Sequence, residues 1–167
     1  MDIEAPLWDA RARMISTVAV GTDGSATAAE AVEMAAELAQ RFGAKLVLLS
    51  AFQDSAVPPG VKGAPTEVQW SFNPQARLRE ILTRAEALLT ERGVPTRTST
   101  VQARAAGPAI VDDANELGAD LIVMGLRYKK RFGGQWDAGR TVPYVMRNST
   151  AAVWCLRAET KELAHTP

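Results

Sequence analysis

Apolar positions along the chain follow two alternating periods. Short runs that are continuously apolar, or alternate with polar residues, are typical of β-strands, and they occur at 17–22, 45–52, 96–103, 119–125 and 151–156. Between them, apolar residues recur every three or four positions, which predicts amphipathic helices at 26–42, between Pro74 and Gly93, between Pro108 and Gly118, and around 142–146. The chain therefore alternates predicted strands with predicted helices.

This spacing also predicts which side chains face the core. In each helix the expected inward residues share one face of a 3.6-residue period. They are Val32, Ala35, Ala39 and Phe42 in the first helix, Leu78, Ile81, Leu82, Ala85, Leu88 and Leu89 in the second, and Ile110, Ala114 and Leu117 in the third.

The alternation of strands and helices predicts the fold class and the domain organisation. Right-handed crossovers between successive strands give an open parallel α/β sheet with helices on both faces. A length of 167 residues with 47% hydrophobic content suits one domain, expected at 15–157. Residues 53–74 contain four prolines and two glycines, which predicts a long surface loop. Residues 1–14 and 158–167 are expected to be tails.

Composition and charge narrow the classes of partner. The chain has 19 basic and 19 acidic residues, so its overall field gives no general attraction to nucleic acid or to an anionic membrane. The single cysteine, Cys155, has no partner for an internal disulfide, and neither a signal peptide nor a membrane span is recognisable. These features predict a soluble cytoplasmic protein without nucleic-acid or membrane partners.

The richest candidate chemistry lies in GLRYKKRFGGQWDAGRT, residues 125–141. Four glycines and five cationic side chains stand in this segment, opposed by Asp137 alone. Parallel sheets bind ligands beyond the carboxyl ends of their strands, where the strand order reverses. If the first and fourth strands are neighbours, residues 22–25, 50–52 and 125–141 meet at that edge. The sequence thus predicts an anion site there.

Three stretches carry a family resemblance: VAVGTDGS at 18–25, ELGADLIVMG at 116–125 and GRTVPYVMRNSTAAVWCL at 139–156. Over residues 15–157 the chain resembles the universal stress protein family. The resemblance implies a five-stranded parallel sheet in the order 3-2-1-4-5, of the adenine-nucleotide alpha-hydrolase-like type. It also implies stress-response dimers that pair through the last strand, and in one branch ATP, with Mg, bound between the first strand and the Gly-rich loop. A second branch of the family does not bind ATP.

The resemblance also implies a set of nucleotide-binding residues, carried over position by position: Thr22, Asp23, Gly24, Ala51, Gly125, Gly133, Gly139, Arg140 and Thr141. Two positions depart from the pattern of the ATP-binding branch, since Tyr128 stands at its second glycine and Arg140 follows the late glycine in place of a small hydroxyl residue. Gly133 is then expected to replace the missing glycine, and Thr141 the missing hydroxyl.

Several of these residues have a second interpretation. Asp23 either contacts the ligand or caps the first helix, a role that Ser25 could also fill. Arg140 either clamps a phosphate or pairs with Asp137. Trp136 either stacks on an adenine or covers apolar neighbours.

Two hypotheses of function follow. In the first, a homodimer pairing through Val153 and Trp154 binds ATP or a related nucleotide. In the second, the protein is an interaction module of the branch without nucleotide, its cleft filled by Tyr128 and Trp136 while the loop at 53–74 contacts a protein partner.

Enzymatic chemistry has little support in the sequence. The only histidine, His165, stands close to the C-terminus, so no base is placed beside a nucleophile. Asp112 and Asp113 are neighbours in a predicted helix, where successive side chains point about 100 degrees apart, and no spacing typical of metal ligands occurs. We expect no catalytic residues and no metal site, and at most slow ATP hydrolysis as a by-product of binding.

Overall fold

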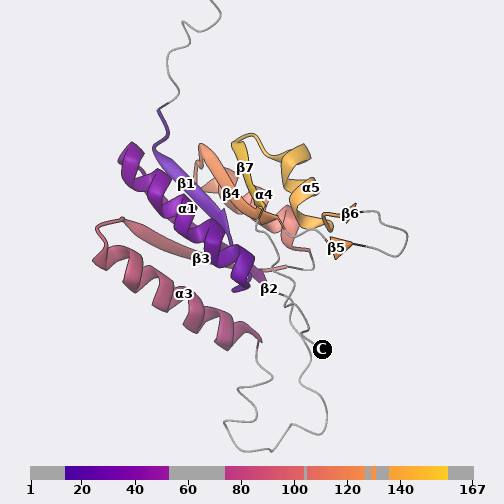
Figure 1. The fold of residues 1–167 in the computed structure, drawn as a ribbon, viewed down its shortest axis with the longest axis horizontal. Coiled ribbons are helices and arrows are strands. Elements are labelled where there is room, and N and C mark those ends of the chain that lie inside the picture. The colour runs from indigo at the N-terminus through magenta and orange to yellow at the C-terminus, as the bar shows by residue number, and fades with distance from the viewer. Residues whose placement is uncertain (1–13, 53–73, 104, 127–128, 131–135, 158–167) are drawn as a thin grey trace, which may run out of the picture.

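The computed structural model describes residues 14–52, 74–103, 105–126, 129–130 and 136–157. Strands and helices alternate along these ranges for most of the chain (Figure 1). The elements are β1 (Thr17–Gly21), α1 (Ala26–Phe42), β2 (Lys45–Phe52), α3 (Pro74–Glu91), β3 (Thr96–Gln102), α4 (Ala106–Glu116), β4 (Leu121–Leu126), β5 (Lys129–Lys130), β6 (Trp136–Asp137), α5 (Thr141–Asn148) and β7 (Ala152–Arg157).

The main sheet has the order β3-β2-β1-β4-β7, and every neighbouring pair is parallel. Strand β1 lies in the middle, with Val18 opposite Leu46 of β2 on one side and Leu121 of β4 on the other. This confirms the predicted five-stranded sheet of order 3-2-1-4-5. The chain builds outward from β1 in both directions, so the strand order reverses between β1 and β4.

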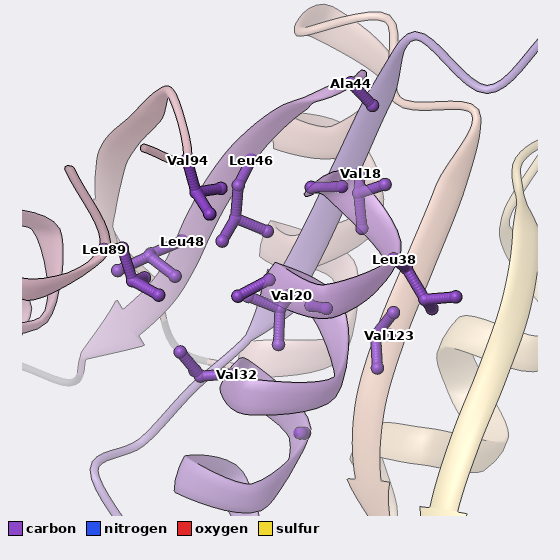
Figure 2. Close-up of a cluster of buried hydrophobic side chains, with 14 of the residues drawn as sticks. Val18, Val20, Val32, Leu38, Ala44, Leu46, Leu48, Leu89, Val94 and Val123 are labelled. Carbon is purple, nitrogen blue, oxygen red and sulfur yellow. The ribbon is translucent and has the colours of Figure 1, made fainter. Parts of the chain in front are cut away.

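Alternate residues of each central strand face two separate core clusters. Val18 and Val20 belong to a cluster shared with α1 and α3, whereas Ala19 belongs to one shared with α4 and α5. Figure 2 shows the first cluster, in which Val32 of α1 lies near Val20 of β1 and Leu48 of β2. The helices therefore cover both faces of the sheet, as predicted for strands that are apolar throughout.

The first helix has well-defined ends. The side-chain oxygen of Ser25 accepts a hydrogen bond from the N–H of Ala28 at 3.3 Å, the geometry of an N-cap. Gly43 ends the helix in the left-handed region at φ 62°, which glycine adopts at little cost. The predicted helix at 26–42 is confirmed at both boundaries.

Helix α4, the third helix expected from the sequence, begins earlier than predicted. It starts at Ala106 rather than Pro108, because a proline within the first turn removes an N–H that needs no partner there. Gly107 makes the close packing of α4 on α5 possible, since a Cβ at this position would lie 2.9 Å from Cδ1 of Tyr144.

Four residues expected to face the core are largely exposed: Phe42 (51%), Leu88 (55%), Leu117 (38%) and Ile81 (37%). For these residues the prediction was wrong. Phe42 is the last residue of α1, and Leu117 caps the end of α4, so both lie where the helix leaves the sheet. Among the described residues, helix α3 contacts the sheet mainly at β2 and β3, near its margin, so a narrow stripe of that helix is covered.

Some predictions fall on residues that the structure does not describe. These are the N-terminal tail and the surface loop, each apart from its last residue, and the C-terminal tail with His165. Among the helices in the described ranges, none has the length and apolar character needed to cross a membrane.

Candidate functional site

A cavity of about 520 Å³ lies at the carboxyl ends of β1, β2 and β4, where the strand order reverses. Its position is the one at which open α/β sheets bind ligands, and its volume is within the range of small-molecule sites. The described residues that line it are Gly21, Thr22, Asp23, Ser25, Thr27, Ala28, Ala51, Ala106, Ile110, Met124, Gly125, Ala138, Gly139, Thr141 and Val142.

Most of the residues predicted for the site come together here. The cavity is lined by Thr22, Asp23, Ala51, Gly125, Gly139 and Thr141. Of the other predicted positions that the structure describes, Gly24 and Arg140 do not line the cavity, and Arg140 lies exposed at the N-cap of α5. Gly133 lies outside the described residues. Segments far apart in sequence thus converge as expected, while Arg140 is not part of the cavity lining.

The cavity also has walls that the sequence did not predict. The start of α4 contributes Ala106 and Ile110, and the first turn of α1 contributes Thr27 and Ala28. The contribution of α4 follows from its packing across β2, a three-dimensional relationship with no local signal. Thr27 did have one, since it stands four and eight residues before Ala31 and Ala35, which puts it on the same face of the helix.

Three helices begin at this cavity, and their N-termini make its wall favourable for an anion. The lining includes first-turn residues of α1, α4 and α5, and none of these first turns contains an acidic residue. Unpaired N–H groups and the positive end of the helix dipole attract negative charge at such positions. Neither Ala105 nor Arg140, the N-cap residues of α4 and α5, forms a side-chain cap hydrogen bond with the described residues.

Much of the cavity lining is apolar. Ile110, Met124 and Val142 belong to the second core cluster, and Ala106 packs against it. Ala51, at the end of β2, borders the same space. A ligand that matches both the apolar side chains and the helix N-termini has a flat or apolar part and an anionic part.

Side-chain hydrogen bonds hold the turn between β1 and α1. Oδ1 of Asp23 accepts from the N–H of Ser25 at 2.9 Å, and Oγ1 of Thr22 accepts from the N–H of Gly24 at 3.2 Å. Ser25, rather than Asp23, is the N-cap, which decides between the two capping interpretations. Asp23 holds the turn through one carboxylate oxygen, and its other oxygen has no partner among the described residues.

The Gly-rich segment contains a short antiparallel ribbon. Lys129 lies opposite Asp137 and Lys130 opposite Trp136 in the β5–β6 pair. Only residues before and after this ribbon, such as Gly125 and Gly139, line the described part of the cavity. Gly139 has a φ of 71°, a left-handed conformation that favours glycine. Tyr128 and the side chains of Trp136 and Asp137 lie outside the described part of the structure, as do the interactions predicted for them.

The fold and the cavity define a parallel α/β protein with a cavity at the reversal of strand order, bordered by the starts of three helices. Residues 14–157 match the universal stress protein family. The chain belongs to the universal stress protein family, as its sequence predicted, and its fold is the adenine-nucleotide alpha-hydrolase-like one.

Several known proteins are similar to this chain. A universal stress protein of Synechocystis is 33% identical over 114 residues, which is 68% of each chain. A solved structure of a universal stress protein family member from Burkholderia pseudomallei has a TM-score of 0.66 and 26% identity, covering 87% of this chain and 98% of that one. A universal stress protein solved in complex with cAMP has a TM-score of 0.61 and 26% identity, covering 86% and 97%.

Proposed function

We propose that this protein binds an adenine nucleotide in the cavity at the ends of β1, β2 and β4. The observation that carries the proposal is that apolar side chains and helix N-termini border the same cavity. The lining includes apolar side chains, among them Ile110, Met124 and Val142, and it also includes the starts of three helices, of which α4 and α5 supply some of those apolar residues. An adenine ring suits the apolar side chains, and a phosphate suits the N–H groups at the helix N-termini.

The related structure that holds cAMP supports a nucleotide ligand and points to one with few phosphates. ATP with Mg²⁺ is the alternative ligand within the same class. Asp23 is the only carboxylate among the described lining residues, and its free oxygen could accept a hydrogen bond from a ribose hydroxyl or contact a Mg²⁺ ion. A cyclic monophosphate needs no metal, so the two ligands differ in their dependence on Mg²⁺.

Calorimetric titration of the purified, ligand-stripped protein tests this proposal. The ligands are cAMP, AMP and ATP, each with and without Mg²⁺, and any small molecule that copurifies is identified by mass spectrometry after denaturation. We expect saturable binding of at least one of these nucleotides and weaker binding in Asp23→Ala. Asp112→Ala, which removes an exposed carboxylate outside the cavity, is the matched control. No copurified nucleotide and no heat with any ligand would reject the proposal and favour an interaction module.

We also propose that the protein acts in the cytoplasm as a stress-response homodimer, paired through β7. In the described sheet β7 is a margin strand, and a margin strand offers backbone groups for pairing with another chain. Trp154 is 45% exposed, whereas Val153 is partly buried against the second core cluster. Trp154 is therefore the stronger candidate for the dimer interface.

Subcellular fractionation tests the proposed cytoplasmic location, and a membrane-bound or secreted pool would contradict it.

A further inference from the structure

Thr27 is a buried side chain whose hydroxyl has no hydrogen-bond partner in the described structure. Only 8% of the residue is exposed, and it is one of two buried polar residues among those described. Threonine hydroxyls in helices often bond to a carbonyl one turn earlier, but Thr27 makes no such bond with the residues that the structure describes. The Thr27 hydroxyl is not one of the fully buried, unpaired side-chain oxygens, which among the described residues are represented by Ser50 Oγ alone, so it is a part of Thr27 that stays accessible.

The surroundings of Thr27 direct this hydroxyl toward the cavity. The residue lies in the first turn of α1 and lines the cavity. Its methyl carbon Cγ2 is on the side of β4, 3.0 Å from where a Cβ of Gly125 would stand. The methyl branch packs against Gly125, and the hydroxyl, which is accessible and has no partner among the described residues, is the polar group that Thr27 contributes to the cavity lining.

Backbone donors accompany the hydroxyl. Ser25 caps the N–H of Ala28, and the N–H of Ala29 bonds to the carbonyl of Ser25. The N–H groups of Ala26 and Thr27 come before this point, where a helix provides no internal acceptor, and neither has a partner among the described residues. The start of α1 therefore presents a hydroxyl and free amides beside the same cavity.

We propose that Thr27 is a specificity-determining residue whose hydroxyl donates a hydrogen bond to a phosphate oxygen of the ligand. This inference rests on the proposed nucleotide binding and adds which group of the nucleotide meets α1. The phosphate lies at the first turn of α1, with the N–H of Thr27 as a second donor. Hydroxyl and amide donors at a helix start suit an anion better than they suit an adenine ring.

Thr27→Val tests the assignment, because valine has the shape of threonine without its hydroxyl. Binding of cAMP and of adenosine is measured by calorimetry for the wild type, Thr27→Val and Thr27→Ser. Hydrogen bonds to charged groups are strong enough that losing one lowers affinity roughly tenfold or more. We expect that loss for cAMP in Thr27→Val, adenosine affinity within about twofold of the wild type, and recovery of cAMP binding in Thr27→Ser.

The free variants add a second readout. Thr27→Val without ligand should melt close to the wild-type temperature, because valine keeps the shape of the side chain and the lost hydroxyl has no partner among the described residues, so lost binding in a stable variant is not explained by unfolding. If the wild type binds cAMP and Thr27→Val binds it equally well, the assignment of Thr27 is overturned while the proposed function stands. If Thr27→Val loses cAMP and adenosine alike, the hydroxyl does not contact the phosphate. If the wild type binds no nucleotide, the proposed function itself is overturned.

Discussion

A Cβ atom on Gly125 would lie 2.6 Å from the carbonyl oxygen of Thr27, closer than any real contact of this kind. Gly125 is not among the described glycines with positive φ. Its position therefore requires glycine because there is no room for a side chain, and not because of its backbone conformation. The contact brings the first turn of α1 against the end of β4, next to the cavity. The first glycine of the Gly-rich segment therefore has a role in packing that does not depend on any ligand.

We expect Gly125→Ala to lower stability by about 1–3 kcal/mol, the usual cost of adding a methyl group where there is no room. The added carbon meets backbone, which cannot rotate away as a side chain can, so α1 must shift and the cavity must change shape. Denaturation by urea measures the loss, and nucleotide affinity should fall in parallel.

Gly43→Ala provides the comparison. Its φ is 62° and nothing lies within 4 Å of the added carbon, so only the left-handed backbone costs energy, about 1–2 kcal/mol. Ligand affinity should stay unchanged in this variant. A Gly125→Ala protein with wild-type stability and affinity would show that α1 and β4 can separate freely.

Asp120 joins the beginnings of β1 and β4 at the end of the sheet opposite the cavity. Its Oδ2 accepts hydrogen bonds from the N–H and hydroxyl of Ser16, at 2.9 and 2.8 Å, and from the N–H of Thr17 at 3.1 Å. We expect Asp120→Ala to destabilise the protein by about 1–3 kcal/mol, because backbone donors lose a charged acceptor. Ser16→Ala, which removes only one of these bonds, should cost about 0.5–1.5 kcal/mol.

Thermal unfolding with and without nucleotide checks this prediction. Since the contact lies at the far end of the strands, both variants should keep wild-type ligand affinity at temperatures where they are folded. Equal stability of Asp120→Ala and the wild type would contradict the structural role of the carboxylate.

The strands were predictable from the sequence because their apolar runs are a strong signal, and their order was predictable because the family motifs are specific. Apolar runs such as that at 119–125 mark buried strands, and the motifs at 18–25 and 116–125 carry the family resemblance that implies the order 3-2-1-4-5. Helix faces were predicted less well. Ile81 and Leu88 satisfy the helical period and are nevertheless exposed, because the period does not say how wide a stripe the sheet covers.

The site was predictable where it follows strand ends and less so elsewhere. Thr22, Asp23 and Gly125 end or follow strands, so topology brings them together. The share of α4 in the cavity depends on how that helix packs across β2, which local sequence does not encode. Arg140 was placed correctly at the start of a helix, since it is the N-cap of α5. It is nevertheless not part of the cavity lining, because a position at a helix start does not by itself fix where the side chain lies.

Cys155 provides a test that depends on pH. The thiol is partly buried against the second core cluster, and burial raises its pKa above the ordinary value of 9.0 by disfavouring the thiolate. The folded protein thus holds the thiol proton at pH values where the unfolded chain releases it. This contribution to stability is complete below the unfolded pKa and is lost as the pH rises through the folded one.

Alkylation with iodoacetamide between pH 7 and about 10 measures this effect, since only the thiolate reacts. We expect slower modification of the native protein than of the protein in urea at each pH. Cys155→Ala should lose less stability than the wild type as the pH rises above 9.0. Equal rates for the native and unfolded thiol would contradict the raised pKa.

Trp154 allows the proposed dimer to be tested by a single change. It stands on β7 at the sheet margin and is 45% exposed, so a seam along this strand would cover its ring, and aromatic rings are typical anchors of interfaces. We expect Trp154→Ser to weaken the dimer by at least about tenfold, in line with the cost of truncating such an anchor. Light scattering after size exclusion, across micromolar concentrations, measures the change.

Phe42→Ser is the matched control, because Phe42 is a similarly exposed aromatic residue that belongs to the end of α1 and not to β7. It should dimerise like the wild type. The melting temperature of the wild type should also rise with protein concentration, because association stabilises the folded chain by mass action, and this dependence should disappear in Trp154→Ser. A wild-type protein that is monomeric at every concentration would reject pairing through β7, and equal weakening by both variants would place the interface elsewhere.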